Sequence, residues 1–297
     1  ENFANKNKIK IVRVEDGFIR SVGLGSDLTR PLSLAFDDLG IYYNPLKESR
    51  LERILNNNVF DKHIISEAEN LINKIVNLRI SKYNFDQNMN FKLENSSYQK
   101  TILVVGQVED DASIKMGGFG IDNAKLLKEV KKINPYAYII YKSHPDVNCG
   151  NRKGNLSTNF LNEFCNLSLG NVNLPTLISM VDEVHTITSL VGFEALLQGK
   201  KVITYGLPFY AGWGLTEDRI SSPRRKRNLS ISELVAGALI LYPRYIDPID
   251  LNYCKPEVLV NRIKDQRYFI ENNKRFRIIN VLRNLIVRLL QKMVIRN

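Results

Sequence analysis

Three consecutive carboxylates, Glu109, Asp110 and Asp111, end an apolar, β-favouring run in VVGQVEDDAS (residues 104–113). Carboxylates this close repel one another and raise each other's pKa values, which suits them to metal binding or to acid–base and nucleophilic chemistry. A solvated turn is the plainer alternative. The triplet imitates the acidic metal motif of metal-dependent sugar transferases only in part, because no histidine or further acid stands near it in the sequence.

A lysine, a histidine and a proline follow another predicted strand in YKSHPD. His144 can donate a hydrogen bond to a phosphate or a base, Lys142 lies beside it, and Pro145 stiffens the turn. His63 and His185 lack such a setting, and we interpret both as structural. The sequence has neither an HExxH motif nor a cysteine–histidine pair spaced for a metal ion.

A serine and a glutamate flank the start of a predicted helix in EVHTITSLVGFEALLQG. Ser189 lies where backbone N–H groups and the helix dipole suit a phosphate, and an ordinary N-cap is the alternative. Glu194 falls inside an otherwise apolar helix, where a lone carboxylate is costly unless a partner bonds it. The hydroxyls of a nucleotide ribose are one candidate partner, and a salt bridge to Lys200 or Lys201 is the other.

The first half of the chain repeats the arrangement of a strand followed by acids, with Glu15 and Asp16 in EDGF. Gly17 gives the backbone freedom for a tight turn, which is the default interpretation. Further on, YGLPFYAGWGLTED (205–218) can pack a corner of the core or line a sugar site with its aromatic rings. The RRKR run (224–227) suits solvent or phosphates.

Strands and helices are predicted to alternate in the second half of the chain. The predicted strands are TILVVGQV, AYIIYKSHPD, EVHTITS and KKVITYG, and the predicted helices are 122–134, 174–182 and LVGFEALLQG. Such alternation predicts parallel βαβ units, in which ligands bind beyond the carboxyl ends of the strands. The acidic triplet, Lys142, His144, Ser189 and Tyr205 all lie at such ends.

The first half is predicted from shorter patterns. KIKIVRVEDGF (8–18) indicates a buried strand that runs into a turn. Apolar residues three and four apart predict helices in SRLERILNN and over 65–80. Residues 82–100 are polar and aperiodic, which predicts an interdomain linker.

The 297 residues suffice for two domains, and with 44% hydrophobic and 25% charged residues they can bury a sizeable core. The first residue is Glu1, so the chain can be one module of a longer protein. No apolar stretch reaches the roughly 18 residues of a transmembrane helix, and no secretory leader opens the sequence. Cys149, Cys165 and Cys254 have no close spacing, which disfavours a disulfide framework and suits a reducing cytoplasm.

The net charge of +11 is concentrated near the C-terminus. Residues 262–296 hold ten basic and two acidic residues, a net charge of +8. Within residues 276–297 apolar residues recur at helical spacing, with basic residues between them. Such a helix can lie on an anionic membrane, or its apolar stripe can pack in the core. The basic tail favours an anionic surface, membrane or nucleic acid, as a partner.

Long motifs of the chain resemble, in order, those of the KpsC capsule-polysaccharide β-Kdo transferases. The motifs are VEDGFIRSVGLGSDLTRPLSLAFDDLGIYY, KYN, LVVGQVEDDASI, YKSHPDV, TSLVGFEALLQGKKV and YGLPFYAGWGLTEDR. The likeness runs from about residue 9 to residue 249. Members of this family commonly carry two related transferase modules in tandem, and GQVEDDASI looks more like the second module.

The resemblance implies an α/β fold of the GT-B type, in which two Rossmann-like domains face a cleft. Residues 1–95 are then expected to form an acceptor-side domain and linker, 96–235 a CMP-Kdo-binding domain, and 236–297 C-terminal helices with the basic tail. In the family the EDG motif lies well inside the first domain, whereas here it starts at Glu15. The first domain is therefore expected to be truncated at its N-terminus, and a second transferase module is a candidate partner.

The resemblance also implies an activity. Kdo, an acidic sugar, would pass from CMP-β-Kdo, with retention of the β configuration, to a Kdo-bearing lipid of the phosphatidylglycerol type. The product would be the poly-Kdo linker of a capsular polysaccharide, made before export by a cytoplasmic protein attached to the anionic inner face of the membrane. No metal or other cofactor is expected in the chemistry, and no nucleic acid is expected as a partner.

Roles for the carboxylates follow from the same resemblance. Asp111 would be the nucleophile, because retention by double displacement needs a carboxylate on the face opposite the leaving CMP. Glu109 and Asp110 would shape its electrostatic field or bond neighbouring backbone. The EDG motif would supply the acceptor base, Glu15 or Asp16, and Asp16 is favoured.

Roles for the nucleotide site are implied in the same way. His144 and Pro145 resemble the CMP-phosphate site shared with sialic acid transferases, and Lys142 lies beside them. Ser189 would hold the phosphate, and Glu194 would hold the ribose.

Two other functions fit the same residues. In an inverting CMP-sugar transferase the EDG acid would deprotonate the acceptor for a single displacement, and Asp111 would only orient groups. The anomeric configuration of the product separates these two mechanisms. A non-catalytic module would instead bind acidic polymer or membrane through the basic tail, and slow hydrolysis of CMP-Kdo without acceptor would count against it.

Overall fold

The computed structural model describes residues 2–23, 28–84, 93, 97–148, 152–170, 172–273 and 275. The predicted basic amphipathic helix of residues 276–297 lies outside them, so both of its alternatives stay predictions. No helix of the described residues is both long and apolar enough to cross a membrane.

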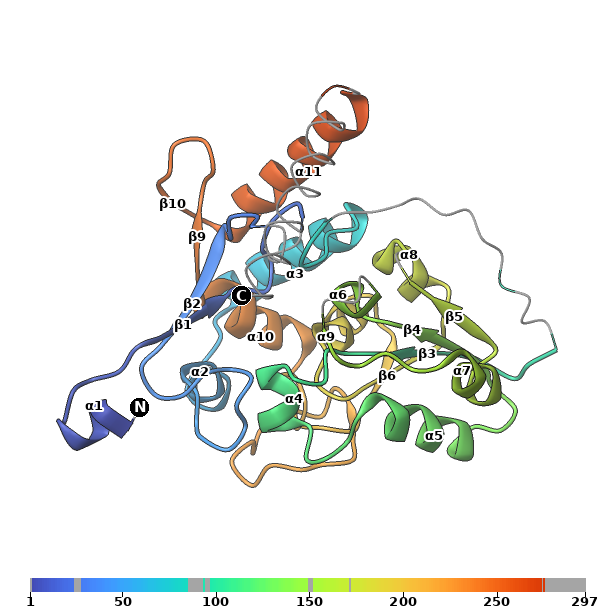
Figure 1. Cartoon of the computed structure of the whole chain (residues 1–297). Helices are drawn as coiled ribbons and strands as arrows, with labels where there is room; N and C mark the ends of the chain where they lie inside the picture. The colour runs from blue at the N-terminus through green and yellow to red at the C-terminus, as the bar shows by residue number, and fades with distance from the viewer. Residues whose placement is uncertain are drawn as a thin grey trace, which may run out of the picture.

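A six-stranded parallel sheet forms what we call the second lobe (Figure 1). Its strands are β3 (Thr101–Val105), β4 (Tyr138–Lys142), β5 (Leu167–Leu169), β6 (Glu183–Thr186), β7 (Lys201–Thr204) and β8 (Glu217–Asp218). They lie in the order β5-β4-β3-β6-β7-β8, and every neighbouring pair is parallel. This is the strand order of dinucleotide-binding Rossmann folds, so the predicted parallel βαβ units are confirmed.

Helices cover both faces of this sheet. They are α4 (Ala112–Gly117), α5 (Asn123–Ile133), α6 (Pro145–Asn148), α7 (Thr158–Phe164), α8 (Leu174–Ser179) and α9 (Leu190–Leu197). Alternate residues of β3 enter two different cores: Ile102 and Val104 pack in one with α5, and Leu103 and Val105 in the other with α8 and α9. Because both faces of the sheet are covered, every residue of β3 and β4 is buried, as is usual for parallel sheets.

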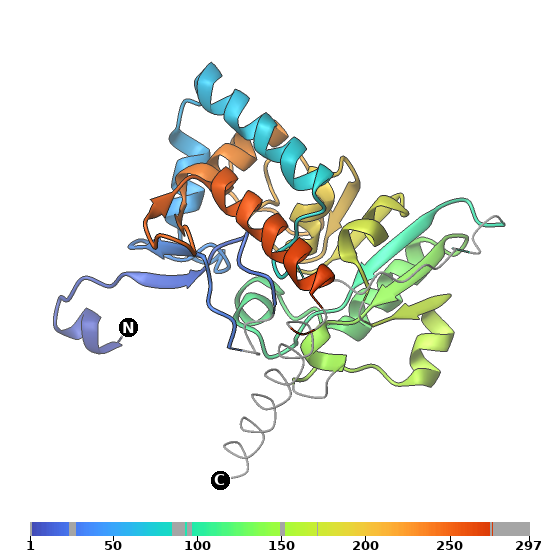
Figure 2. The ribbon, with the colours of Figure 1, turned by 90° about the horizontal axis from the view of Figure 1, so that it is seen from above.

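An antiparallel sheet of four strands forms the first lobe, together with most of the remaining helices. In sheet order the strands are β1 (Arg13–Asp16), β2 (Ser33–Asp37), β9 (Pro243–Ile246) and β10 (Tyr253–Cys254). The helices are α1 (Asn2–Lys6), α2 (Arg50–Asn57), α3 (Lys62–Asn77), α10 (Ile231–Val235), the π-helical turn η2 (Ala236–Leu241) and α11 (Pro256–Asn272). Figure 2 shows α3 and α11 side by side over this lobe.

The first lobe differs from its sequence prediction in three respects. Its sheet is antiparallel, unlike the parallel sheet expected of a Rossmann-like domain. The strand predicted over 8–18 is four residues long and half-buried, with Val14 52% exposed, because β1 is an edge strand. The segment after residue 236, predicted as helices, also contributes β9 and β10, which pair with β2 and with each other.

The two lobes share one apolar core. It includes Phe18 and Leu71 from the first lobe and Leu177 and Phe193 from the second. The RRKR run adds polar contacts to this core, since the guanidinium groups of Arg224 and Arg225 both bind Glu52 of α2, itself 4% exposed. Arg225 also lies over the ring of the buried Trp213. These two arginines therefore hold elements together, whereas the sequence predicted solvent or phosphates.

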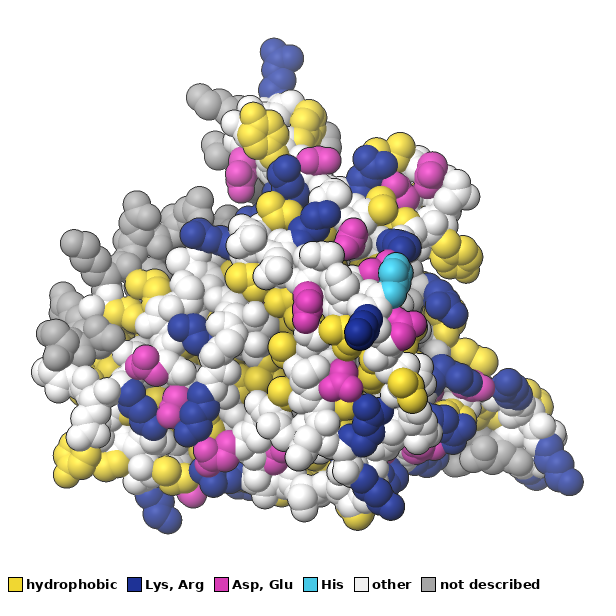
Figure 3. Space-filling view, turned by 180° about the vertical axis from the view of Figure 1, so that it is seen from behind, with side chains coloured by type: hydrophobic (Ala, Val, Ile, Leu, Met, Phe, Trp, Pro, Cys, Tyr) yellow, Lys and Arg dark blue, Asp and Glu magenta, His cyan; other side chains and the backbone are white. Residues whose placement is uncertain are grey.

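The charge outside the basic tail is nearly balanced. Residues 262–296 carry +8 of the net charge of +11, so the rest of the chain carries +3. On the face seen in Figure 3, basic and acidic side chains are interspersed. The tail is therefore the main source of the excess positive charge.

Candidate functional site

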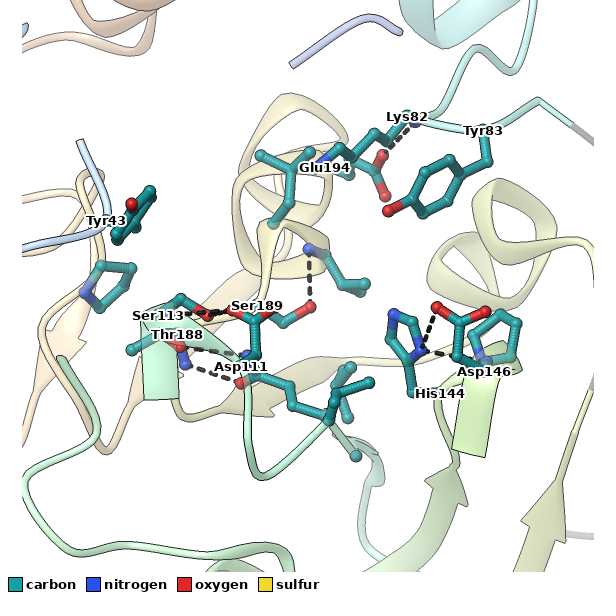
Figure 4. A pocket seen from close by; sticks show the side chains of 18 of the residues that line it. Tyr43, Lys82, Tyr83, Asp111, Ser113, His144, Asp146, Thr188, Ser189 and Glu194 are labelled. Carbon is teal, nitrogen blue, oxygen red and sulfur yellow. Dashed lines mark hydrogen bonds and ion pairs between the residues drawn. The ribbon is translucent and has the colours of Figure 1, made fainter. Parts of the chain in front are cut away.

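A pocket of about 410 Å³ lies between the lobes at the carboxyl ends of β3, β4 and β6. It brings together all eight side chains that the sequence predicted as site residues: Glu15, Asp16, Asp111, Lys142, His144, Pro145, Ser189 and Glu194. The first lobe contributes the two acids of β1 and the rings of Tyr42 and Tyr43, and the second lobe contributes the other six predicted residues. Figure 4 draws the side chains of 18 lining residues and labels ten of them.

The strand order explains why the pocket lies here. β3 and β6 are neighbours from which the chain proceeds toward opposite edges of the sheet, and ligands of such folds bind at this switch point. The two loops that follow these strands are joined by Gln107, whose side chain accepts the Thr188 N–H at 2.8 Å and donates to the Thr188 hydroxyl at 3.1 Å. The loops bearing Asp111 and Ser189 are therefore fixed relative to each other.

Asp111 is exposed and caps α4. Its Oδ1 atom accepts the backbone N–H of Ser113 at 2.9 Å and the hydroxyl of Ser113 at 2.7 Å. Both bonds go to one oxygen, so Oδ2 has no hydrogen-bond partner among the described residues. A carboxylate that is oriented through one oxygen and open at the other is suited to nucleophilic attack.

The other two acids of the triplet form hydrogen bonds with other residues. Glu109 accepts the N–H of Asn123 at 3.2 Å. Asp110 accepts two bonds from Arg152 at 3.0 and 3.1 Å, and this pairing holds the pKa of Asp110 below its ordinary value. The expectation of mutually raised pKa values is thus wrong for Asp110. No group of three or more metal-ligating side chains occurs in the part of the chain that the structure describes.

Lys142 and His144 line the pocket at the end of β4. Lys142 is buried, and burial lowers its pKa to about 8. Burial also lowers the pKa of His144 to about 4, so its imidazole is neutral at neutral pH. The Nδ1 atom of His144 accepts the N–H of Asp146 at 3.2 Å, which leaves the proton on Nε2 as a donor. The pair can thus offer a cation and a neutral hydrogen-bond donor to an anionic group.

Ser189 is a helix N-cap, as the structural alternative predicted, and it also lines the pocket. Its hydroxyl accepts the N–H of Val191 at 3.2 Å and caps α9, while its carbonyl accepts a bond from the buried Tyr210 hydroxyl. Gly192 permits this bond, because a Cβ there would lie 2.3 Å from the Tyr210 oxygen. The start of α9 is therefore held firmly while its N-terminal end faces the pocket.

Glu194 bonds the main chain of another segment. Its Oε1 atom accepts the N–H of Lys82 at 2.9 Å. The two lysines proposed as alternative partners contact other groups, since Lys200 donates to the Ser179 carbonyl and Lys201 pairs with Glu183 and Glu217. Glu194 thus joins α9 to the segment that enters the interlobe region.

Glu15 and Asp16 face the pocket from the last residues of β1. The Nε atom of Arg20 donates to Asp16 Oδ2 at 2.5 Å, and Arg20 is buried. The next residue, Gly17, is required by close packing, because a Cβ there would lie 2.2 Å from the Ser33 hydroxyl. Its φ is not positive, so a turn does not require the glycine.

Sequence analysis missed several lining residues. Lys82 and Tyr83 were assigned to a linker, although their KYN motif was among those that carried the family resemblance. The aromatic loop both packs the core, through Tyr210 and Trp213, and lines the pocket, through Phe209. The interpretation of His185 as structural agrees with its position, since it is buried between Glu183 and Tyr205. Tyr205, which the sequence placed at a ligand-binding strand end, bonds His185 and is not among the residues that line this pocket.

Comparisons with known proteins agree with this architecture. A family model described as capsule polysaccharide biosynthesis protein matches residues 1–245. The chain is 48% identical over 272 residues to the capsule polysaccharide modification protein LipA of Neisseria meningitidis serogroup A, covering 91% of this chain and 38% of LipA. It is 46% identical over 248 residues to the lipopolysaccharide-processing protein LpsZ of Rhizobium meliloti, covering 82% of this chain and 56% of LpsZ. The chain thus spans 38 to 56% of the length of these relatives.

Two solved structures of Thermosulfurimonas dismutans KpsC are similar over most of their length. The one described as a beta Kdo 2,4 transferase matches with a TM-score of 0.79 and 34% identity, covering 88% of this chain and 81% of that chain. The one described as a beta Kdo 2,7 transferase matches with a TM-score of 0.73 and 40% identity, covering 89% and 82%.

A nucleotide-type Rossmann lobe that faces a second lobe across a pocket defines a fold of the GT-B type. The chain belongs to the capsule polysaccharide biosynthesis protein family, and the resemblance to KpsC that its motifs predicted is confirmed.

Proposed function

We propose that the chain is a retaining β-Kdo transferase, which moves Kdo from CMP-β-Kdo to a Kdo-bearing lipid. The observation that carries the proposal is the pocket itself, where the open carboxylate of Asp111 shares one cavity with Lys142, His144 and Ser189. The names of the two similar KpsC structures, both Kdo transferases, support the choice of sugar.

Donor binding would use the carboxyl ends of β4 and β6. The Lys142 ammonium and the His144 Nε2–H group would hold the phosphate of CMP, assisted by the N-terminal end of α9 at Ser189. Glu194 would accept a bond from the ribose on the same side of the pocket. Because His144 is neutral, it contributes a hydrogen bond, and Lys142 contributes the charge.

The transfer would proceed in two displacements. In the first, Asp111 attacks the anomeric carbon, the bond to the CMP phosphate breaks, and Lys142 stabilises the charge on the leaving phosphate. In the second, a carboxylate of β1, Glu15 or Asp16, takes the proton of an acceptor hydroxyl. The resulting oxygen attacks the same carbon and releases Asp111, so the β configuration is restored.

The acceptor proposed here is a Kdo-bearing lipid of the phosphatidylglycerol type at the cytoplasmic face of the membrane. The basic residues of 262–296 support attachment to an anionic surface, because each cation near such a surface contributes about 1 kcal/mol. A second transferase module remains a proposed partner, in keeping with the greater length of LipA and LpsZ.

The test is incubation with CMP-Kdo, generated in situ, and a soluble Kdo-terminated acceptor, followed by NMR of the product. We expect a β-linked Kdo, and the same spectrum reports which hydroxyl is linked. An α-linked product would establish the inverting mechanism instead. If the protein neither transfers Kdo nor slowly hydrolyses CMP-Kdo, it acts as a non-catalytic module.

A further inference from the structure

Residues 81–84 cross from α3 to the interlobe pocket and are held there by main-chain bonds. The Lys82 N–H donates to Glu194 of α9, and the Lys82 carbonyl accepts bonds from the N–H groups of Arg20 and Ser21 at 3.3 and 3.4 Å. The Tyr83 carbonyl accepts the Gly23 N–H at 2.7 Å. These bonds join the segment to both lobes without using the side chain of Lys82.

The Lys82 side chain lines the pocket, and its ammonium lies 5.5 Å from the centre of the Tyr83 ring. Burial acts to lower the pKa of Lys82, but the phenol groups of Tyr42 and Tyr83 and the nearby carboxylates Asp16 and Glu15 raise it above its ordinary value overall. Lys82 is therefore a permanent cation at neutral pH. In Figure 4, Lys82, Tyr83 and Glu194 lie across the same pocket from Asp111 and His144.

The lining cations can be compared with the anionic groups of the donor. Lys82, Lys142 and Arg152 are the lysine and arginine side chains that line the pocket among the described residues. Arg152 is bound to Asp110, and Lys142 lies beside His144 on the side proposed for the phosphate. The donor carries a second anion, the sugar carboxylate. Without a neighbouring cation, this carboxylate would be repelled by the acids Glu15, Asp16 and Asp111.

We propose that Lys82 binds the carboxylate of the transferred sugar and thereby selects acidic sugars, an inference that rests on the proposed function. In Kdo this carboxylate is attached to the anomeric carbon, so anchoring it fixes which face of that carbon is presented to Asp111. The Tyr83 ring beside the ammonium restricts where the ammonium can lie. Lys82 is thus a specificity-determining residue supplied by the segment between the lobes.

The experiment compares 2-deoxy-β-Kdo with its methyl ester, in which the carboxylate is neutralised, by calorimetry of binding to the full chain saturated with CMP. Wild-type protein should bind the acid at least about tenfold more tightly, the usual scale of a charge-assisted bond. The preference should disappear in Lys82→Met and persist in Lys82→Arg. Lys62→Met, a change on the exposed surface of α3, is the matched control and should keep it.

Kinetics provide the second measurement. Lys82→Met should lower kcat/KM for Kdo transfer about 10- to 100-fold and leave CMP affinity within about twofold, because Glu194, proposed to hold the ribose, bonds the main chain of Lys82, which the substitution keeps. Wild-type protein that binds acid and ester equally, or fails to bind the acid, overturns the inference, as does a preference that survives in Lys82→Met. Absence of transfer or of CMP binding in wild type is a separate result and contradicts the proposed function.

Discussion

The two sides of the pocket are built in different ways. On the second-lobe side, Asp111 and Ser189 follow the two central strands of a parallel sheet, and a network through Gln107 and Tyr210 fixes their loops. On the first-lobe side, Glu15 and Asp16 lie on β1, a four-residue edge strand that pairs with one neighbour only. The first arrangement is buried on both faces, whereas in β1 Val14 is exposed and the other three residues are half-buried.

This difference implies that the second-lobe side holds its groups in fixed positions, whereas the first-lobe side can adjust its groups to a ligand. Groups proposed to act on the donor are held before any ligand binds, which is where preorganisation contributes most to rate. Groups proposed to act on the acceptor lie on an element with fewer packing contacts and therefore lower local stability. Changes on the second-lobe side should consequently affect chemistry, and changes on the first-lobe side should affect acceptor use and local stability together.

The largest effect is expected from Asp111→Ala. Removing the proposed nucleophile should lower transfer by at least about 10³-fold, because no glycosyl intermediate can form. CMP affinity should change by less than about twofold, since the carboxylate acts on the sugar. Intact-mass measurements on wild-type protein should also detect a Kdo adduct, and peptide mapping should place it on Asp111.

Asp110→Ala is the matched control for this prediction. Asp110 is the neighbouring acid, but it is bound to Arg152, so its loss should leave transfer within about tenfold of wild type. Transfer by Asp111→Ala at a rate near that of wild type would remove double displacement through this residue.

The next largest effect concerns the acceptor base. Asp16 forms an ion pair with the buried Arg20, which gives this carboxylate a structural role. We therefore propose Glu15 as the acceptor base, although the sequence favoured Asp16. Glu15→Gln should lower kcat about 10²-fold, and the limb of the pH–rate profile that reports the base should disappear.

Asp16→Asn should act differently. It leaves Arg20 without its carboxylate, so the melting temperature should fall, while kcat should be reduced less than in Glu15→Gln. A larger loss of kcat in Asp16→Asn, with the limb that reports the base removed there, would return the role to Asp16.

Sequence patterns predicted the second-lobe side far better than the first. The strand–helix alternation and the N-cap at Ser189 are local features, and the structure has them where the patterns place them. The first-lobe sheet is different, because β2 pairs with β9 about 200 residues away and each strand is too short to show a period.

Single residues show the same limit. Lys82 lies in a polar stretch without periodicity, and its position depends on Glu194, 112 residues further along the chain. Arg225 lies in a run of like charges that is typical of solvent, yet Glu52 and Trp213 bury it. Such positions are set by tertiary contacts that local composition does not encode.

A moderate effect is expected at the nucleotide side. His144→Ala and Ser189→Ala should each weaken CMP binding by roughly 1–3 kcal/mol, the scale of a lost hydrogen bond to a charged group. Calorimetry with CMP measures this directly and needs no acceptor. Ser157→Ala is the matched control, because Ser157 caps α7 through the same kind of bond but does not line the pocket. Unchanged CMP affinity in both His144→Ala and Ser189→Ala would place the donor elsewhere.

The smallest effect is a pH dependence that Lys142 should impose on CMP binding. Its pKa of about 8 is lowered by burial, so in the free protein it loses its proton as the pH rises through 8. A bound phosphate stabilises the ammonium and raises this pKa, so binding takes up a proton above pH 8. CMP affinity should therefore be level near pH 7 and fall by up to about tenfold per pH unit above 8.

Lys142→Arg distinguishes this titration from a general loss of structure at high pH, because a guanidinium stays protonated throughout the range. Affinity in that variant should be level between pH 7 and 9.5, whatever its absolute value, while the control Lys62→Met should keep the wild-type slope. A level wild-type profile over the same range would mean that the Lys142 ammonium does not contact the phosphate. The cation that contacts the phosphate would then have to be Lys82 or Arg152, and the contrast between the two sides of the pocket would be weakened.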